Sequence, residues 1–595
     1  MKNSANHRTG DITCLAFAAL FLAGFSALAF KLEYVQLDNV AEMSYYAERQ
    51  SVRRVKFAGE RGRILTADGT ILAANRPTRA IVVNPDSYQL RTWDSTVSNI
   101  LSTLSRLEPI IERPSILQAK DIRKHLEKSI AMPIIAWRDL TDEELARFSE
   151  HQLDFPGLDC EETLERIYPQ GSFASHLIGY VGRDKIKSID GDSRAYYVGF
   201  EMRGRAGLEV HYDSYLRGIP GEMNLTVDAR GFAHRQTTVL ESQKGPDLVV
   251  SLDTAMQKAA EKVLEGISGA CAAIDPRDGS VLVLASSPAY DPNDFVPVLR
   301  TALWKDLSKD KSKPLLNRAT SGSYAPGSTF KTITAFAAMQ AGVSPTEEIE
   351  CSGAFVLGKM KIRCTGVWGH GPMNLERALA KSCNPYFCEA GMRAGTNLLI
   401  RTARKFGLGE KTGIDFSDEA RGVVPDAEWK KEHWNENWYP GDLPQMSIGQ
   451  GMLLVTPLQM ARVAGAIGTG YLATPHLKAG EETKKIPLPF PKWQLDAVKK
   501  GMNKVVQSGT GKRAGERLNV KVAGKTGTAE VGAGATRRKN AWFIAYAPAE
   551  NPTVALAIVI ECGESGGATA APKAREILKA KFGELAAIEE EEEAL

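Results

Sequence analysis

An uninterrupted apolar run over residues 12–30 constrains this chain more than any other feature of its sequence. The run contains no charged side chain and, as an α-helix, would be about 28 Å long. That length matches the hydrocarbon core of a bilayer, so we expect one transmembrane helix here. Lys2 and Arg8 precede the run, which favours a cytoplasmic leader over residues 1–11 and export of everything that follows.

A cleaved signal peptide is the alternative interpretation of this run, because Ala27-Leu28-Ala29 fits the small-residue cleavage pattern. The apolar stretch is longer than the core of a usual signal peptide, so we favour a retained anchor. No second run of this kind follows in the sequence. The sequence therefore predicts a single-pass membrane protein with an exported folded part.

The remainder of the 595-residue chain is too long for one hydrophobic core, so we expect two or three domains. Its composition, with 43% hydrophobic and 24% charged residues, is that of ordinary globular proteins. The net charge of +3 argues against a dedicated nucleic-acid-binding protein. Residues 589–593 are all acidic, and we interpret residues 586–595 as a solvated, disordered tail.

The exported part divides into two predicted units. In the first, residues 31–245, a helical stalk over 32–50 precedes a strand, an Asp-Gly turn and a second strand within 62–72. Apolar residues have helical spacing over 97–148, and short strands return over 208–239. This unit has a mixed α/β pattern and no compact cluster of reactive residues.

The second predicted unit covers residues 246–585. A strand over 248–252 leads into a helix over 253–264, and a hairpin follows around the turn 276–279. Helical segments occupy the middle of the unit, whereas strands return near its end and a last helix covers 572–581. Strands at both ends with helices between them predict an α+β layout, in which one sheet is assembled from distant segments.

The first motif with chemical meaning is Ser328-Thr329-Phe330-Lys331. Pro and Gly precede it and a helix follows, so the serine and the lysine share one face of the first turn. A buried, neutral lysine can take the proton of a serine hydroxyl. Ser308-Lys309-Asp310-Lys311 has the same spacing but lies in a charged run, where its lysine stays solvated and protonated.

The second motif is Ser382-Cys383-Asn384, which is followed by Pro385. The residue before a proline disfavours helix, so we expect a loop between two helices here. Ser382 can pass a proton and Asn384 can hold a peptide amide. A helix cap is the alternative role for both residues, because Ser and Asn serve it well.

The third motif is Lys525-Thr526-Gly527-Thr528. Its small residues suggest a strand edge that another backbone can approach closely. A lysine and two hydroxyls beside such an edge suit a peptide that ends in a carboxylate, so Thr526, Gly527 and Thr528 are candidate substrate-binding residues. Lys411-Thr412-Gly413 is a second match, but it lies in a predicted loop with no strand before it.

Together, in this order and context, the three motifs resemble the penicillin-binding proteins and serine β-lactamases. Flanking segments narrow the resemblance to class B penicillin-binding proteins of the elongation type, the penicillin-binding protein 2 family: residues 61–64, 68–69, 166–169, 176–182, 207–209, 324–331, 368–371, 384–387 and 447–451. The resemblance implies a transpeptidase fold, an antiparallel sheet covered by helices, on an elongated mixed α/β pedestal. The pedestal is then the first unit, residues 31–245, and the second unit lies in the periplasm of a bacterium.

The resemblance also implies a mechanism for cell-wall cross-linking. Ser328 attacks the carbonyl of the penultimate D-alanine of a stem peptide, and Lys331 acts as the base. The backbone N–H groups of Ser328 and Thr528 form the oxyanion hole. A neighbouring stem's amine then resolves the acyl-enzyme, β-lactams acylate the same serine, and catalysis needs no cofactor.

The remaining site residues take supporting roles under the same resemblance. Ser382 and Lys525 help proton transfer to the leaving D-alanine, Asn384 holds the donor amide, and Thr526 and Thr528 bind the terminal carboxylate. The pedestal has no room for a glycosyltransferase domain. Polymerisation is therefore expected of a partner, a SEDS-type, RodA-like membrane glycosyltransferase of the cell-elongation complex that the pedestal binds and activates.

Three of the eight cysteines and one histidine have a spacing that fits a closed tetrahedral zinc site: Cys351, Cys364, His370 and Cys383 in C-x12-C-x5-H-x12-C. A Cys351–Cys364 disulfide is the alternative in an exported hairpin, and free thiols are a third possibility. Cys383 favours zinc, because it is the middle residue of the Ser-Cys-Asn loop and bound metal would fix that loop. The role of the metal would be structural.

Other functions fit the sequence less well. A β-lactamase lacks a use for an anchor and a pedestal, and no Glu-x-x-Leu-Asn follows Ser382. Residues 563–567 imitate a nucleophile elbow, but no histidine follows His476. A D,D-carboxypeptidase differs only in using water as the acceptor. A non-catalytic scaffold or activator of a membrane glycosyltransferase is the non-enzyme alternative, against which the complete motifs argue.

Overall fold

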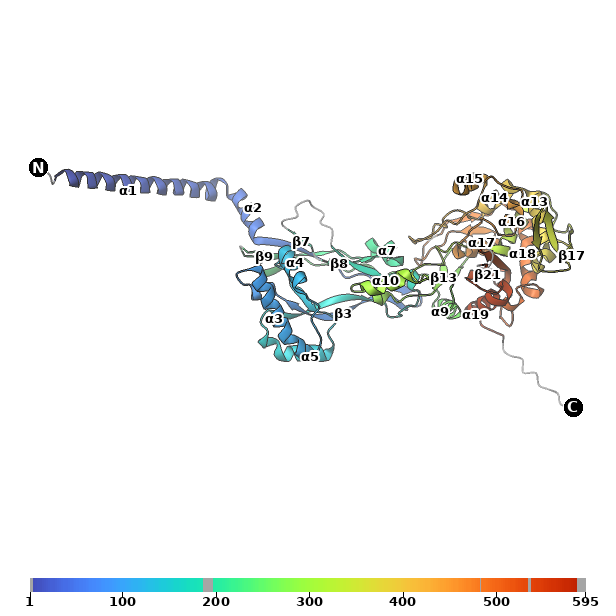
Figure 1. Ribbon diagram of the computed structural model, residues 1–595, viewed down its shortest axis with the longest axis horizontal. Helices are drawn as coiled ribbons and strands as arrows, with labels where there is room; N and C mark the ends of the chain where they lie inside the picture. Colours follow the sequence, from blue (N-terminus) through green and yellow to red (C-terminus); the bar gives the residue numbers. More distant parts are fainter. Residues whose placement is uncertain are drawn as a thin grey trace, which may run out of the picture.

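The computed structural model describes residues 4–185, 196–198, 200–228, 230–481, 483–532 and 537–585. The acidic tail predicted over 586–595 lies outside the described residues. Figure 1 shows a long N-terminal helix, an elongated middle part and a rounder C-terminal part arranged in line. The middle part is the pedestal and the C-terminal part is the second unit.

The predicted N-terminal helix is present as α1 (Ser4–Glu33), which continues through the π-turn η1 (Tyr34–Asp38) into α2 (Val40–Ser51). Residues 12–38 are, among the described residues, the one helical stretch long and apolar enough to cross a membrane. Its large apolar side chains are exposed and contact no other part of the fold; Phe21 and Phe25 are each 72% exposed. This exposure is what a bilayer would cover.

Two sheets build the pedestal. One has the strand order β10-β9-β1-β7, and the other has the order β11-β2-β3-β4 with β5 paired to the far end of β3. The strands are β1 (Val52–Phe57), β2 (Ile64–Thr66), β3 (Ile71–Val83), β4 (Ile134–Trp137), β5 (Leu158–Ile167), β7 (Tyr196–Val198), β9 (Gly221–Val227), β10 (Ala233–Leu240) and β11 (Leu248–Val250). A separate pair consists of β6 (Val181–Lys185) and β8 (Phe200–Gly204).

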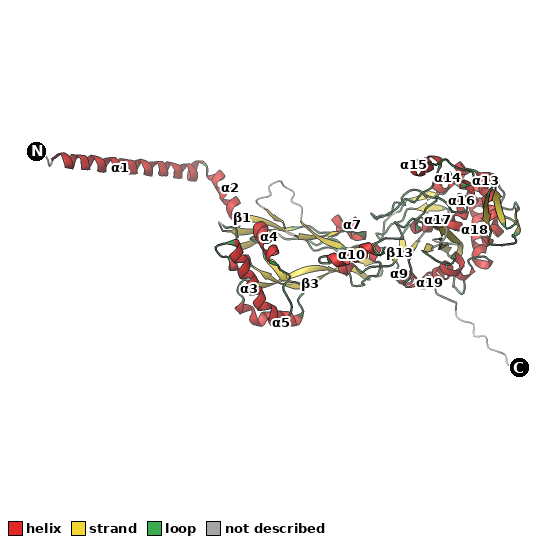
Figure 2. Ribbon diagram, in the orientation of Figure 1, coloured by secondary structure: helices red, strands yellow, loops and turns green. Residues whose placement is uncertain are grey.

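Three helices cover the end of the β3–β4–β5 sheet that lies nearer the N-terminal helix (Figure 2). They are α3 (Trp93–Ile111), α4 (Ala119–Ser129) and α5 (Asp142–His151). Their apolar faces and the inner residues of the strands form one core around Trp137 and Phe148. The sequence predicted the helices but not β4, which lies inside the stretch 97–148. β4 is only four residues long, and its pairing with β3 decides its conformation, which helical spacing in the flanking segments conceals.

The remaining short helices of the pedestal are α6 (Ser175–Ile178), α7 (Gly207–His211) and α8 (Asp213–Leu216). The prediction of strands from residue 208 onward was therefore wrong at its start, where α7 and α8 precede β9. Gly207 has φ +61°, and a Cβ there would lie 2.5 Å from the carbonyl oxygen of Leu177. The glycine lets α7 pack directly against α6.

A buried ion cluster joins three of the pedestal segments on which the family resemblance rests. Glu209 of α7 accepts from Arg61 Nε at 2.6 Å and from Arg166 Nε at 2.8 Å. All three side chains are at most 5% exposed. Burial by itself would raise the pKa of Glu209, but the two guanidinium groups outweigh it and the pKa is lowered. The three side chains therefore remain charged in the interior.

The second unit is built on one antiparallel five-stranded sheet with the order β13-β12-β22-β21-β20, as predicted. Its strands come from both ends of the unit: β12 (Gly269–Ile274), β13 (Val281–Ser287), β20 (Ala523–Val531), β21 (Arg538–Ala547) and β22 (Val554–Ile560). β20 is the last strand in this order, so one of its edges is available.

Helices cover both faces of this sheet (Figure 2). Helix α17 (Pro457–Thr469) lies against β12, β21 and β22 on one face, together with α11 (Lys331–Gln340) and α13 (Asn384–Ala394). On the other face, α9 (Thr254–Leu264) and α19 (Ala571–Phe582) pack against each other. Other helices are α10 (Thr301–Lys309), α12 (Leu375–Lys381), α14 (Thr396–Lys405), α15 (Ala427–Trp434), α16 (Asp442–Ser447) and α18 (Lys492–Ser508).

Small strand pairs extend from the helical side of the second unit: β14 (Ile349–Cys351) with β17 (Gly371–Met373), β15 (Ala354–Leu357) with β16 (Met360–Arg363), and β18 (Tyr471–Ala473) with β19 (Lys485–Pro487). Figure 1 shows β17 at the end of the molecule farthest from the membrane helix.

Candidate active site

Ser328 lies in a 3-10 turn, η5 (Gly327–Phe330), that leads directly into α11. Side chains three residues apart eclipse one another in a 3-10 turn, so Ser328 and Lys331 project from the same side. Ser328 is partly exposed, whereas Lys331 is completely buried. In the described part of the chain, the Ser328 hydroxyl makes no hydrogen bond, so its oxygen is not engaged by a competing group.

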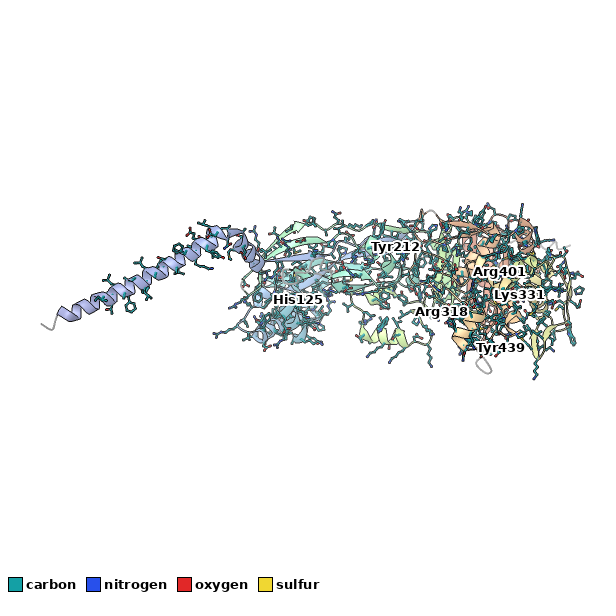
Figure 3. All side chains as sticks on the ribbon, turned by 90° about the horizontal axis from the view of Figure 1, so that it is seen from above. His125, Tyr212, Arg318, Lys331, Arg401 and Tyr439 are labelled. Carbon is teal, nitrogen blue, oxygen red and sulfur yellow. The ribbon has the colours of Figure 1, made fainter. Side chains whose placement is uncertain are left out.

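Lys331 Nζ lies in the interior of the second unit (Figure 3), where it donates to Ser382 O at 2.7 Å and to Asn384 Oδ1 at 2.6 Å. These two carbonyl-type oxygens can use both N–H bonds of a neutral amine and leave its lone pair free. Burial lowers the pKa of Lys331 to about 8. At pH 7 about a tenth of the amine is therefore neutral and able to accept a proton, far more than for an ordinary lysine.

The Ser382-Cys383-Asn384 segment is the predicted loop between two helices, α12 and α13. Ser382 adopts a left-handed conformation with φ +54°, which is uncommon for a residue other than glycine. This conformation ends α12 and directs both the carbonyl and the hydroxyl of Ser382 toward Lys331, whose Nζ is 3.3 Å from Oγ. Asn384 begins α13, and its Nδ2 donates to Arg363 O at 2.7 Å.

Lys525 lies on the edge strand β20 and is also completely buried. Its Nζ donates to Ser382 Oγ at 3.0 Å and to Thr526 O at 2.9 Å. Burial lowers the pKa of Lys525 well below its ordinary value, and the charge of Lys331 lowers it further. The hydroxyl of Ser382 therefore lies between two buried amines, and within the described residues neither amine forms a salt bridge with a carboxylate.

Close packing of glycines brings the serine turn against the edge strand. Gly327 has φ +54°, and a Cβ there would lie 2.8 Å from Thr528 O. A Cβ at Gly527 would lie 2.9 Å from Pro326 O. Neither position has room for a side chain, so the backbone before Ser328 and the Thr526–Thr528 backbone lie side by side.

The structure adds residues that motif analysis missed. Thr510 Oγ1 lies 2.6 Å from Thr526 Oγ1, and Trp542 Nε1 donates to Ala325 O at 3.0 Å just before the serine turn. Gln450 Nε2 donates to Thr528 O at 3.3 Å. These residues come from segments with no reactive spacing of their own. For Thr510 the local signal for a close approach was the run of small residues Ser508-Gly509-Thr510-Gly511, whereas Gln450 lies in residues 447–451, a segment already included in the family resemblance.

The two duplicate motifs lie apart from this site. Lys411-Thr412-Gly413 is a loop, as predicted, and its threonine hydroxyl donates to Glu419 rather than lining a strand edge. Ser308 lies in the last turn of α10, and Lys311 follows the helix and is exposed, as predicted.

The four predicted metal ligands come together beside the Ser-Cys-Asn loop. Their ligand atoms, the Sγ atoms of Cys351, Cys364 and Cys383 and one nitrogen of His370, all lie within 4.8 Å of one another. His370 Nδ1 is 3.7 Å from Cys351 Sγ and 3.5 Å from Cys364 Sγ, and the Cys364 and Cys383 sulfurs are 4.0 Å apart. All eight cysteines are free thiols, so Cys351 and Cys364 are not joined to each other.

The chain matches two family models: the penicillin binding protein transpeptidase domain over residues 269–579 and the penicillin-binding protein dimerisation domain over residues 56–250. It is 33% identical to the peptidoglycan D,D-transpeptidase MrdA of Acinetobacter baumannii over 575 residues, 91% of this chain and 83% of that protein.

Solved structures of similar fold include penicillin-binding protein 2 of Helicobacter pylori in complex with MreC, with a TM-score of 0.76 and 28% identity over 89% of this chain and 99% of that one. A chain of a peptidoglycan synthase complex has a TM-score of 0.71 and 29% identity over 98% of this chain and 100% of its own length.

An antiparallel sheet covered by helices, with a serine turn, a Ser-Cys-Asn loop and a Lys-Thr-Gly edge strand around one point, defines a penicillin-binding transpeptidase. The pedestal and the relatives narrow the class further. The chain belongs to the elongation-type class B penicillin-binding proteins, the penicillin-binding protein 2 family, and is a peptidoglycan D,D-transpeptidase. The family predicted from the sequence motifs is therefore confirmed.

Proposed function

We propose that this transpeptidase works through an acyl-enzyme on Ser328, with Lys331 as its base. The observation that carries the proposal is the convergence of two completely buried lysines, Lys331 and Lys525, on the hydroxyl of Ser382. A buried amine with a lowered pKa is the kind of group that can activate a serine near neutral pH.

In the first half-reaction, Ser328 Oγ bonds to the carbonyl carbon of the penultimate D-alanine, and its proton moves to Lys331 Nζ. The oxyanion is bound by the backbone N–H groups of Ser328 and Thr528. The amide C–N bond then breaks, and the D-alanine amine leaves with a proton delivered through Ser382, which connects Lys331 and Lys525. An amine of a neighbouring stem peptide later attacks the ester, releases Ser328 and forms the cross-link.

The edge of β20 holds the substrate's carboxylate end. The hydroxyls of Thr526 and Thr528 bind the terminal carboxylate, and Gly527 lets the peptide backbone approach the strand closely. Asn384 binds the donor amide. Its Oδ1 is already oriented by Lys331 and its Nδ2 by Arg363 O, which supports this assignment because the amide plane is held on both sides.

Labelling by a fluorescent penicillin tests the assignment of the nucleophile. Full-length protein in detergent micelles should form a stable covalent adduct, and mass spectrometry of the digest should place it on the peptide that contains Ser328. Ser328→Ala should remove the label, whereas Ser308→Ala, in the duplicate motif on α10, should keep it. Labelling that persists in Ser328→Ala would sink the assignment.

We further propose that residues 1–11 form a cytoplasmic leader, 12–30 the membrane anchor, 31–245 a pedestal and 246–585 the catalytic unit, with the last two in the periplasm. The family-model matches over 56–250 and 269–579 support two units, although β11 (Leu248–Val250) lies beyond residue 245 and pairs with β2 in a pedestal sheet. Relatives occur in a complex with MreC and in a peptidoglycan synthase complex. The pedestal is therefore proposed to bind elongation-complex partners, among them a RodA-like glycosyltransferase.

A purified complex tests the partner assignment. The RodA-like protein should co-purify with the full-length chain, and its polymerising activity should fall when the pedestal is replaced by that of a division-type relative. Retention of both binding and activation by the chimaera would place the contact outside residues 31–245.

We also propose that Cys351, Cys364, His370 and Cys383 hold a structural zinc ion. In a tetrahedral site, Zn–S bonds of about 2.3 Å and Zn–N bonds of about 2.0–2.1 Å place sulfurs about 3.8 Å apart and sulfur and nitrogen about 3.5 Å apart. The separations of 3.5, 3.7 and 4.0 Å found here fit that geometry. Bound zinc would stiffen the Ser-Cys-Asn loop through Cys383.

Elemental analysis tests the zinc site. Full-length protein purified without chelator should contain one zinc per chain, and Cys364→Ser should lose it. Cys388→Ser is the control, because Cys388 is a buried thiol on α13 that lies outside the cluster. A metal-free protein that yields a disulfide-linked Cys351–Cys364 peptide after non-reducing digestion would overturn the proposal.

A further inference from the structure

The hairpin β15–β16 lies directly beside the proposed active site. The carbonyl of Arg363, the last residue of β16, accepts the hydrogen bond from Asn384 Nδ2 at 2.7 Å. Two residues later, Thr365 Oγ1 donates to Lys381 O, the residue before Ser382. The hairpin therefore borders the Ser-Cys-Asn loop.

A tight turn follows the hairpin and presents apolar side chains at its tip. Gly369 N donates to Gly366 O at 3.0 Å, which places Val367 and Trp368 at the two central positions. Val367 is 80% exposed and Trp368 is 97% exposed. Turn tips usually carry small or polar residues, so a fully exposed indole at this position is costly unless something covers it.

The position of this turn is fixed by its backbone. A Cβ at Gly353 would lie 2.8 Å from Val367 O, and a Cβ at Gly369 would lie 2.2 Å from Cys351 O. The turn is thus pressed against the segment that contains Cys351. Trp368 lies five residues from the Arg363 carbonyl, at most about 16–18 Å along an extended chain, which is also the reach of an extended pentapeptide.

The charge of this surface has one sign. Residues 351–375 contain no aspartate or glutamate but include Lys359, Lys361 and Arg363. These three side chains and that of Lys381 are exposed, and within the described ranges none of them forms a salt bridge. Lys361 and Arg363 flank the buried Ile362 and so share the outer face of β16. Such a surface attracts carboxylates.

We propose that residues 354–363 and the turn 366–369 form a second substrate-binding surface, which holds the carboxylate-bearing part of the donor stem peptide that precedes its D-alanyl-D-alanine end. Lys359, Lys361 and Arg363 face the side carboxylates of the stem, and the Trp368 indole packs over its backbone and alkyl groups. The proposal rests on the proposed function, because it extends the donor site that ends at Ser328 and Asn384. A penicillin occupies the D-alanyl-D-alanine position alone and so does not reach this surface.

The test compares three acylating substrates on the full-length protein in detergent micelles. The first is a stem pentapeptide that ends in D-alanyl-D-alanine and carries free side carboxylates, and the second is the same peptide with those carboxylates amidated. The third is the fluorescent penicillin. Release of D-alanine gives the rate constant kcat/KM for the peptides, and labelling gives the second-order rate constant for the penicillin.

The double variant Lys359→Glu/Lys361→Glu should lower kcat/KM for the acidic stem about tenfold and kcat/KM for the amidated stem much less. The two reversed charges remove two weak ion pairs with the stem carboxylates and replace them with repulsion. Trp368→Ala should lower kcat/KM for both stems about tenfold. The penicillin rate should stay within about twofold of wild type in both variants.

The matched controls are Lys305→Glu and Trp304→Ala on α10, a helix with no buried residue that lies near the pedestal in Figure 1. They should leave all three rates unchanged. Equal peptide rates in wild type and in both surface variants would overturn the proposal, as would a parallel loss with penicillin. Failure of the wild type to react with penicillin or to release D-alanine would instead refute the proposed function.

Discussion

Arg61 and Arg166 in the pedestal are nearly as deeply buried as Lys331 and Lys525 in the second unit. The two arginines surround Glu209, which accepts from both within 2.8 Å, so their charge is compensated. Within the described part of the chain, the two lysines contact carbonyl and hydroxyl oxygens and form no salt bridge with a carboxylate. Burial consequently lowers the pKa of both lysines, whereas the pKa of Arg61 is raised because Glu209 and Asp213 outweigh its burial.

This difference in compensation indicates two roles for buried basic side chains: the paired arginines stabilise the fold, whereas the unpaired lysines can take part in proton transfer. A buried ion pair costs desolvation that its geometry offsets, and its loss is destabilising because the partner stays charged. An unpaired buried lysine reduces the same cost by losing its proton, and it thereby becomes a base. Removal of charge should therefore impair stability in the pedestal and chemistry in the second unit.

The largest effect is expected from Lys331→Met, which keeps the length of the side chain and removes its amine. Acylation by fluorescent penicillin should slow by about 10²–10⁴-fold, the usual contribution of a positioned base, while the midpoint of thermal unfolding should not fall. Stopped-flow labelling and calorimetry measure the two quantities. Lys411→Met, in the duplicate Lys-Thr-Gly motif, is the control and should change neither. A Lys331→Met variant that unfolds readily would remove the contrast between the regions.

Glu209→Gln tests the opposite half of the comparison. It leaves two buried guanidinium groups facing a neutral amide, and the free energy of unfolding of the pedestal should fall by about 3–5 kcal/mol. Denaturant unfolding followed by tryptophan fluorescence measures the loss, and the acylation rate of folded protein should be preserved. Glu127→Gln breaks the exposed pair with Arg123, 3.4 Å long, and should cost less than about 0.5 kcal/mol. Similar losses from both variants would contradict the argument from burial.

The pH dependence of acylation gives the next largest effect. In the proposed mechanism Lys331 reacts in its neutral form, and burial lowers its pKa to about 8. The neutral fraction, and with it the rate of penicillin acylation, should rise about tenfold per pH unit below 8 and level off above it. The rate measured from pH 6 to pH 9 at constant ionic strength checks this. A profile that is flat between pH 6 and 8 would mean that Lys331 is already neutral or is not the base.

The sequence motifs predicted the residues of the candidate active site better than they predicted the tertiary contacts that surround it. Ser328, Lys331, Ser382 and Lys525 belong to short patterns whose spacing survives without knowledge of the fold. The buried triad was not predicted, although each of its members lay in a segment that resembled the family. A salt bridge between residues 148 positions apart, such as Arg61 with Glu209, has no local signature, because it depends on where the segment before β2, the strand β5 and the helix α7 meet.

The lack of a local sequence signature also explains why the contact of Thr510 with Thr526 and the strand β4 were not predicted. Thr510 reaches Thr526 only because α18 ends beside β20, and β4 is a strand because β3 is available to pair with it. The four candidate metal ligands were predicted as a set because three thiols and one imidazole form an unusual combination that can be recognised across long gaps in the sequence. A tertiary contact between two common residue types, such as two threonines, has no comparable pattern in the sequence.

Tyr168→Phe should produce the smallest effect. It tests how much of the stability of the pedestal's ion cluster comes from hydrogen bonds rather than from charge. Its hydroxyl donates to Glu209 Oε1 at 3.3 Å and accepts from Val181 N at 3.1 Å, so its removal leaves the cluster charged and balanced but one buried N–H unpaired. The free energy of unfolding should fall by about 1–2 kcal/mol.

Tyr546→Phe is the control for this change, since its buried hydroxyl has no hydrogen-bond partner within the described residues and should cost close to nothing. Denaturant unfolding of both variants makes the comparison. If Tyr168→Phe matched the loss caused by Glu209→Gln, the stability of the cluster would depend on its hydrogen bonds rather than on its charge balance. If Tyr168→Phe instead costs several-fold less free energy of unfolding than Glu209→Gln, most of the cluster's stability comes from the negative charge that compensates the two guanidinium groups. The two buried lysines of the candidate active site lack such a compensating charge.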